Sequence, residues 1–360
     1  MKSFHGQTFI KTRVNEYIKN GYEVDVLTLG KKKIIKKNNN LKFLIFNNYE
    51  EIKIFLKKNI INYNNFFIHF ITFQLIKIIR EFKDTNFCIW IHGIEAQKWN
   101  WYNFDLFLKP IWFFKHIIYN VIQLYFLRGF VLSNKKNIKI IFNSRWMKKV
   151  YMSDLGIKKI KNKFKIIPNP VDESFFKRFK REKKRKLNIL IIKNFSSYKY
   201  AGDITINHLI ELSKYKIFKN LNITLIGKGK ILDKKVSFLK KLYNIKIINK
   251  FIDNKKLIKY HQTNDIFLYL TRMDAQSVTL SEALASGLVV ISSNNTAIPE
   301  FINHNKNGFL IKNFDNFYKI INDLNKNIGL IDKISKHAKN TSFYLKPNYI
   351  FKEEKKFLNL

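Results

Sequence analysis

Short apolar runs recur along the chain and alternate with segments in which apolar residues repeat at helical spacing. In the first half, this pattern predicts buried strands at 21–29, 41–46, 86–93 and 138–144. The same rhythm restarts in the second half, with strands predicted at 187–192, 221–227, 244–252, 265–271 and 288–293. Short apolar strands that alternate with helices are typical of a parallel, doubly wound sheet. Two such α/β units in tandem would face each other across a cleft, and ligands would approach the carboxyl ends of their strands.

Prolines and charge separate the two halves. The run 164–176 contains Pro168 and Pro170, which exclude a continuous helix or a central strand. The run that follows, 177–186, is dominated by Lys and Arg and has too few apolar residues to build a core. We therefore predict a first domain over 1–172, a basic linker over 173–186, a second domain over 187–335, and a C-terminal helix in 336–360 that packs back toward the first domain.

The segment 110–133 is apolar or aromatic on nearly every side and is interrupted by Lys115, His116 and Arg128. It is either a helix buried in a large domain or a helix that lies in a membrane interface, with its basic side chains at the level of the headgroups. A wholly apolar helix does not show by its sequence what covers it. No run of about 18 uncharged apolar residues occurs, which argues against a membrane-spanning helix.

Composition changes this picture mainly through charge. The chain has 360 residues, of which 46% are apolar and 26% charged, as expected for globular domains, and its formal net charge is +41. Such a charge favours anionic partners: nucleic acid, an anionic membrane surface or phosphorylated substrates. A joint excess of Lys, Asn, Ile, Phe and Tyr would equally follow from an A+T-rich coding sequence, so charge alone leaves both explanations open. Cys88 is the only cysteine, which excludes an intrachain disulfide, and we expect no secretory signal because 1–17 has no apolar region.

The most informative stretch runs from 272 to 301. The sequence VTLSEALASG predicts a helix that begins near Ser277 to Thr279 and ends at Gly287. The free N–H groups at the start of such a helix form an anion site suited to a diphosphate. Asp274 precedes the helix and Glu282 lies about one turn inside it, and each carboxylate is able to accept hydrogen bonds from two sugar hydroxyls. The alternative is that Glu282 is a plain acid on the helix surface and Asp274 a loop cap.

The run 274–311, DAQSVTLSEALASGLVVISSNNTAIPEFINHNKNGFLI, resembles the C-terminal signature of the retaining group 1 (family 4) glycosyltransferases. Other runs match that family in the right order: WIHGIEA, FNSRWMKK with KIIPNPVDESFF, KNFSSYKYAGD and LIGKG. The resemblance covers most of the chain and is strongest from Lys193 to Ile311. It implies a GT-B fold of two Rossmann-like domains, the first binding the acceptor and the second the sugar nucleotide, and it implies that no metal is required.

Carried over position by position, the resemblance implies roles in the donor site. Glu282 would hold the ribose hydroxyls, and Asp274 would hold the donor sugar. Lys193 and Lys199 would neutralise the departing diphosphate, an electrostatic task. The resemblance also implies His92 as a catalytic residue beside the donor sugar, Val278, Thr279 and Gly227 as donor-binding residues, and Gly6 and Glu95 as acceptor-side residues.

Several of these positions also have structural explanations. A lone histidine after a strand, such as His92, is often structural, and Glu95 reads equally as a charge at a helix N-terminus. The chain also departs from the family pattern: Asp274 stands where Glu is usual, and Lys193 stands where Arg, with its bidentate fork, is common. The strand expected before the helix at 5–21 is absent, since only MKSF precedes it. Its loss would leave two neighbouring strands without a partner, and we expect a missed start or a truncated first domain.

These observations favour an enzyme that moves a hexose from a nucleotide-diphosphate sugar to a glycan or lipid-linked acceptor with retention, in lipopolysaccharide or surface polysaccharide synthesis. The expected site is cytoplasmic, on the inner face of the cytoplasmic membrane, with an anionic membrane surface as partner and no specific nucleic acid. A sugar-nucleotide epimerase of the same fold is the first alternative. A non-catalytic nucleic-acid binder is the second, although the basic residues are spread along the chain. A truncated, inactive relative is the third.

Overall fold

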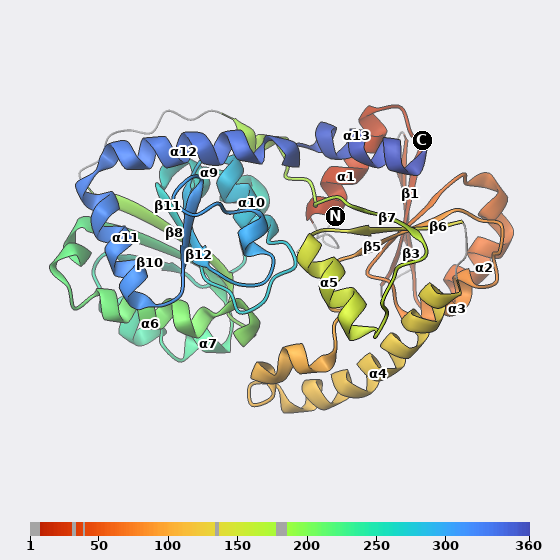
Figure 1. The fold of residues 1–360 in the computed structure, drawn as a ribbon, viewed down its shortest axis with the longest axis horizontal. Coiled ribbons are helices and arrows are strands. Elements are labelled where there is room, and N and C mark those ends of the chain that lie inside the picture. The colour runs from red at the N-terminus through yellow and green to blue at the C-terminus, as the bar shows by residue number, and fades with distance from the viewer. Residues whose placement is uncertain (1–7, 31–33, 39, 134–136, 178–185) are drawn as a thin grey trace. The chain divides into compact units, whose positions relative to one another are not determined.

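The structure is a computed structural model that describes residues 8–30, 34–38, 40–133, 137–177 and 186–360 (Figure 1). Its internal contacts divide the chain into two compact units. Unit 1 comprises residues 1–99, 114–170 and 347–360, and unit 2 comprises residues 100–113 and 171–346. The predicted limits had placed 100–113 in the first domain.

Unit 2 is a doubly wound sheet of six parallel strands in the order β10-β9-β8-β11-β12-β13. The strands are β8 (Leu187–Asn194), β9 (Leu221–Lys228), β10 (Ile245–Ile248), β11 (Ile266–Tyr269), β12 (Val289–Ser293) and β13 (Gly308–Ile311). In Figure 1, α6 and α7 lie on one side of this sheet, and α9 and α10 on the other. The helices are α6 (Gly202–Leu212), α7 (Lys230–Asp233), α8 (Val236–Lys240), α9 (Asn254–Thr263), α10 (Val278–Ala285), α11 (Phe314–Lys326) and α12 (Ile328–Ser342).

The core of unit 2 follows from its strand sequences. β11 reads IFLY and is buried at every position, and β12 is buried along its first four residues. Strands that are covered on both faces need such continuous apolar runs. These runs made the strands of unit 2 predictable from the sequence. Because β11 and β12 are buried, the groups that follow their carboxyl ends occupy fixed positions.

Unit 1 contains two sheets instead of one. The first has the order β1-β3-β2, with β2 antiparallel to β3, and the second has the parallel order β4-β5-β6-β7. Their strands are β1 (Val24–Leu29), β2 (Ile34–Asn38), β3 (Leu41–Phe46), β4 (Phe66–His69), β5 (Phe87–Ile91), β6 (Ile138–Phe142) and β7 (Lys163–Ile166). The helices are α1 (Thr8–Lys19), α2 (Tyr49–Asn59), α3 (Phe73–Ile79), α4 (Pro110–Leu132), which crosses the unit boundary, α5 (Arg145–Asp154) and α13 (Pro347–Leu358).

The division into two sheets falls where the sequence predicts a missing central strand. Among the described residues, β1 and β4 each have a single strand neighbour. The hydroxyl of Tyr63, just before β4, donates a 2.5 Å hydrogen bond to Asp25 of β1. Leu27 of β1 and Phe66 of β4 pack on the same apolar cluster. Among the described residues, side-chain contacts therefore connect β1 and β4, which do not pair through backbone hydrogen bonds.

Four strands were not predicted, namely β2, β4, β7 and β13. Three of them have four residues each, which is too short for a reliable pattern. The predicted linker also needs correction at its start. Glu173–Phe176 forms a short 3₁₀ helix of unit 2, and the buried ring of Phe175 lies 5.1 Å from that of His261. Residues 178–185 of the linker lie outside the described residues.

The predicted apolar helix at 110–133 is α4. Only one of its faces is buried, so the expectation of a fully buried helix is wrong. In the part of the chain that the structure describes, no helix is both long enough and apolar enough to cross a membrane.

The C-terminal helix α13 packs on α1 within unit 1 through a buried ion pair. Glu354 accepts hydrogen bonds from Arg13 Nε at 2.7 Å and from the Tyr17 hydroxyl at 2.8 Å, and the Arg13 and Glu354 side chains are only 3% and 0% exposed. The guanidinium carbon of Arg13 also lies 5.3 Å from the ring centroid of Trp90. The first helix and the last helix of the chain are thus joined by charge in a site closed to water.

Glu354→Ala should lower the free energy that protects α1 from local opening by roughly 3–5 kcal/mol, because it leaves the Arg13 charge buried and unpaired. Hydrogen exchange of peptides from α1 and α13, followed by mass spectrometry, measures this protection. The matched control is Glu353→Ala, which removes an exposed pair with Lys165 and should cost less than about 1 kcal/mol. Equal effects of the two substitutions would contradict the role given to the buried pair.

Candidate functional site

Asp274 lies in the loop after β11, at the carboxyl end of the unit 2 sheet. Its Oδ2 accepts a 2.7 Å hydrogen bond from the hydroxyl of Tyr269, the last residue of β11, and its Oδ1 accepts a 3.1 Å bond from the Gln276 N–H. Burial raises the pKa of Asp274, and the positive charges of Lys199 and Lys193 act in the opposite direction. The structure thus brings Asp274 together with both predicted lysines.

Lys193 near the end of β8 is a buried cation. Its Nζ donates hydrogen bonds to the carbonyls of Tyr200 at 2.6 Å and Leu270 at 2.5 Å, and it lies 4.8 Å from the ring centroid of Tyr269. Burial lowers the pKa of Lys193 to about 7. Two of the three ammonium donors are therefore engaged by backbone, so Lys193 holds the strand ends in place in addition to any contact with a ligand.

Lys199 lies in a short 3₁₀ helix, Tyr198–Tyr200, and is half-buried. Its Nζ is 5.8 Å from the ring centroid of Tyr102 and 5.6 Å from that of Tyr200. Asp105 anchors the start of this segment, because its carboxylate accepts from the Ser197 hydroxyl at 2.5 Å and from the Tyr198 N–H at 2.8 Å. Lys199 is thus the more exposed of the two predicted phosphate-binding lysines.

A second pair of charges, not predicted from the sequence, stabilises the same loops. Arg272 binds Asp203 through two parallel hydrogen bonds of 2.7 Å, and it also donates to the carbonyl of Tyr198 at 2.7 Å. Burial raises the pKa of Asp203, but the hydrogen bonds and charge of Arg272, together with backbone hydrogen bonds, outweigh this and leave that pKa below its ordinary value. The partners are 69 residues apart, so no local sequence pattern connects them.

Helix α10 begins as predicted, at Val278. The Ser277 side chain caps it by accepting from the Leu280 N–H at 3.1 Å. The N–H groups of Val278 and Thr279, in the first turn, lie outside the hydrogen-bond ladder of the helix. Together with the positive end of the helix dipole, they favour an anion at this position.

Glu282 faces the interior from α10 and is 4% exposed. Burial, together with the nearby negative charge of Asp172, raises the pKa of Glu282 to about 8. Among the described residues, no hydrogen-bond donor is in place for its carboxyl group. The reading of Glu282 as a plain surface acid is therefore wrong. A buried carboxyl group without a partner is costly, and such groups concentrate in binding and catalytic sites.

Gly227 has a packing role in the structure. Its φ is +155°, and a Cβ at this position would lie 1.9 Å from the carbonyl oxygen of Lys193 on the neighbouring strand. Glycine is needed here because β9 approaches β8 closely. The donor-binding role of Gly227 stays a prediction.

His92 directly follows β5 in unit 1 and pairs with a second histidine. Its Nε2 lies 3.0 Å from Nδ1 of His69, the last residue of β4, and the ring centroids of Phe9 and Phe70 are 5.0 and 4.5 Å from its own. Burial, aided by the charge of Arg13, lowers the pKa of His92 to about 3, so the imidazole is neutral at pH 7. His69 was missed because it ends a strand that was itself missed.

Of the two residues predicted on the acceptor side, one has a clear structural role. The carboxylate of Glu95 accepts from the backbone N–H of His92 at 2.5 Å and from that of Gly93 at 3.0 Å. It therefore shapes the loop that carries His92 and does not begin an α-helix, which corrects the alternative reading. Gly6 lies outside the described residues.

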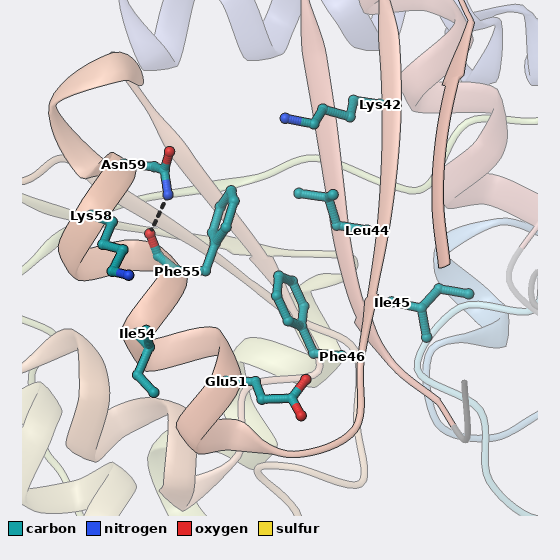
Figure 2. Close-up of a pocket in the computed structure, with 9 residues that line it drawn as sticks. All are labelled: Lys42, Leu44, Ile45, Phe46, Glu51, Ile54, Phe55, Lys58 and Asn59. Carbon is teal, nitrogen blue, oxygen red and sulfur yellow. Dashed lines mark hydrogen bonds between the residues drawn. The ribbon is translucent and has the colours of Figure 1, made fainter. Parts of the chain in front are cut away.

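A hollow of about 410 Å³ lies elsewhere in unit 1, between β3 and α2 (Figure 2). The rings of Phe46 and Phe55 lie next to each other in it, with centroids 5.4 Å apart, and Lys42 and Lys58 also line it. None of the predicted site residues lines this hollow. The candidate chemistry therefore rests on the loops at the carboxyl ends of the strands.

The family model described as Glycosyl transferases group 1 matches residues 172–341, a stretch that includes Lys193, Asp274 and Glu282. The matched stretch is similar to the proteins of that family. It covers nearly all of unit 2, and the match supports the resemblance to that family. The narrower assignment to the retaining family 4 enzymes stays a proposal.

Two relatives match a larger share of the chain than the family model does. The alpha-monoglucosyldiacylglycerol synthase of Acholeplasma laidlawii is 26% identical over 244 residues, which cover 61% of this chain and 60% of that protein. An uncharacterized 41.2 kDa protein in the cps region of Klebsiella pneumoniae is 26% identical over 237 residues, which cover 54% of this chain and 62% of that protein. The matches thus span about 60% of the length of these curated relatives.

Among solved structures, the sucrose-phosphate synthase of Thermosynechococcus elongatus resembles this chain with a TM-score of 0.77. The match covers 98% of this chain and 92% of the synthase, with 10% sequence identity. At that identity the likeness shows the fold alone. It confirms the predicted fold class: α/β, with two Rossmann-like domains of the GT-B type.

Glu282→Gln should stabilise unit 2 increasingly as the pH rises. Between about pH 4.5 and about pH 8, the folded state keeps a proton on Glu282 that the unfolded state loses, so the wild type loses stability across this window. The difference in unfolding free energy between variant and wild type should grow by on the order of 3 kcal/mol from the lower to the upper end.

Urea unfolding at several pH values measures this difference. The control is Glu173→Gln, at an exposed position of the same unit, which should change the unfolding free energy by less than about 0.5 kcal/mol. A difference for Glu282→Gln that stays constant with pH would contradict the buried, protonated state of this side chain.

Proposed function

We propose that the protein transfers a hexose from a nucleotide-diphosphate sugar to a glycan or lipid-linked acceptor, with retention of the anomeric configuration. One observation carries the proposal: Asp274 lies at the carboxyl end of the unit 2 sheet together with Lys193 and Lys199. An acid for sugar hydroxyls and two cations for a leaving diphosphate are the groups that this chemistry needs, and they occupy the edge where doubly wound sheets bind ligands.

In this proposal each group has one task. In the reaction, the bond between the sugar C1 and the diphosphate oxygen breaks, the acceptor oxygen bonds to C1, and the acceptor proton is released to the leaving diphosphate. Lys199 and the first N–H groups of α10 stabilise the negative charge that develops on the diphosphate. Asp274, oriented by Tyr269, binds hydroxyls of the donor sugar, and Glu282 binds the ribose. We expect turnover to persist in the presence of a metal chelator, as the resemblance implies.

The acceptor class is proposed from the relatives. One is named as a synthase of a glucosylated diacylglycerol, and the other is encoded in a cps region. Both support an acceptor that belongs to a glycolipid or a surface polysaccharide, including lipopolysaccharide. We place the reaction on the cytoplasmic face of the membrane, where such acceptors and sugar nucleotides meet.

Sugar nucleotides should raise the thermal unfolding midpoint of the protein. With a panel of UDP-, GDP- and ADP-sugars, the correct donor at about a hundredfold excess over its Kd should raise the midpoint by roughly 5–10 °C, because it binds the folded state alone. Glu282→Ala should abolish this shift, measured relative to the midpoint of the variant itself. A preserved shift in Glu282→Ala would mean that the donor binds elsewhere.

Further measurements distinguish the competing functions. Steeply salt-dependent RNA binding, without any thermal shift by a sugar nucleotide, would support the nucleic-acid binder and contradict the transferase. Conversion of the donor into its epimer without an acceptor would support the epimerase. In the transferase reaction, proton NMR should show the same anomeric configuration in the product as in the donor, and an inverted product would contradict retention.

Lys199→Ala should reduce kcat by about 10²–10³-fold, because the lost charge acts mainly on the leaving group in the transition state. Binding of the donor should change far less, and the thermal shift assay measures this on the same sample. Lys255→Ala, on the exposed surface of α9, is the control and should leave kcat unchanged. Loss of donor binding with unchanged kcat at saturation would assign Lys199 to ground-state binding instead.

A further inference from the structure

The part of α4 that belongs to unit 1, residues 114–132, exposes apolar side chains to solvent. Phe114, Ile118, Val121 and Tyr125 are exposed by 60%, 66%, 57% and 75%, and Leu132 is also exposed. At helical spacing these positions fall on one face, in a stripe about 60° wide and roughly 27 Å long. An exposed apolar stripe of this kind is unusual on a soluble protein surface and indicates a binding surface.

The opposite face of α4 is buried, yet it carries polar residues. Gln123 donates to the carbonyls of Ile71 at 3.0 Å and Glu95 at 3.1 Å, and Asn120 donates to the carbonyl of Gln97 at 2.8 Å. Asn120 and Gln123 are each 1% exposed, and His116 on the same face is also buried. The inner face therefore combines buried apolar side chains, such as Leu127 and Phe130, with these three buried polar residues.

The buried polar residues of α4 determine which side of the helix faces outward. The inner side of the helix makes specific hydrogen bonds to the loops that follow β4 and β5, and the second of these carries His92. Its rotation about its own axis is thus fixed by buried hydrogen bonds, which would be lost if the apolar face turned inward. The apolar stripe is held outward by the fold.

Basic side chains flank the stripe. Lys115 lies along one margin of the stripe and Arg128 along the other, and both are exposed. On the side of Lys115, Lys77 of α3 lies over the ring of Phe126, with Nζ 4.9 Å from the ring centroid. An apolar stripe between cations is the pattern of a helix that lies in the interface of an anionic membrane, with its cations at the level of the phosphates.

We propose that the outer face of α4, residues 114–132, docks on an anionic lipid bilayer, with Phe114, Ile118, Val121 and Tyr125 inserted below the headgroups. Lys115 and Arg128 bind lipid phosphates, and the formal charge of +41 adds long-range attraction to the same surface. Because the inner face of α4 holds the loop of His92, docking places that loop directly behind the membrane contact. The inference rests on α4 and stands independently of the proposed function.

The test uses the full-length protein and sedimentation with vesicles of phosphatidylcholine, alone or mixed with phosphatidylglycerol. The protein should bind the mixed vesicles, bind the neutral ones at least about tenfold more weakly, and bind less as salt is raised. Ile118→Asp combined with Tyr125→Asp should weaken binding to mixed vesicles by at least about tenfold. The uncharged variant Ile118→Gln with Val121→Gln should act in the same direction, which keeps the test valid if the acidic variant does not fold.

The matched control is Tyr243→Asp with Phe251→Asp, which changes two exposed apolar residues of unit 2 by the same charge. If the control lowers binding as much as the α4 variants, charge alone accounts for the attraction and the proposal is wrong. Equal binding of wild type and both α4 variants would also overturn it. The remaining alternative is that the outer face of α4 binds a second copy of the chain, which analytical ultracentrifugation tests. A wild-type dimer that the α4 variants convert to monomer, without any vesicle binding, would support that alternative and overturn the proposal.

Discussion

The ammonium group of Lys193 connects three segments that are far apart in the sequence. Its two short hydrogen bonds hold the carbonyls of Tyr200 and Leu270, so the ends of β8 and β11 and the 3₁₀ helix of Lys199 meet around one buried cation. Removal of a lysine from water is costly, and its lowered pKa reflects that cost. The ring of Tyr269 and the charge of Asp274 offset part of it. The positions of the other groups in the site depend on this arrangement.

Around this centre, the two acids of the site are stabilised in opposite ways. Asp274 is oriented by a hydroxyl and a backbone N–H and lies close to positive charge. Glu282 is buried on α10, and the charge that acts on it is that of another acid, Asp172. The first is ready to act as an anion, whereas the second keeps its proton unless a donor reaches it. Both carboxyl groups have a pKa raised by burial, and groups with such perturbed pKa values concentrate at functional sites.

The sequence predicted the parts of the structure that local patterns determine. The long apolar strands of unit 2 and the helix start at Val278 were predicted because burial on both faces and a capping serine leave a direct sequence pattern. The pairs Arg272–Asp203 and His69–His92 were not predicted, because each joins residues from separate loops. The two faces of α4 were also beyond the pattern. Its residues are apolar on nearly every side, so it is the burial of Leu127 and Phe130 and the contacts of Asn120 and Gln123 in the structure that show which side faces the protein.

The ion pair between Arg13 and Glu354 has a consequence for biosynthesis. Its partners are separated by 341 positions, and all of unit 2 except residues 100–113 lies between α5 and α13 in the chain. A ribosome therefore completes unit 2 before it supplies the helix that neutralises Arg13. Until then, unit 1 lacks the helix that covers Arg13 and pairs with its charge. The order of folding is thus expected to run opposite to the order of synthesis, with unit 2 as the first stable body on the nascent chain.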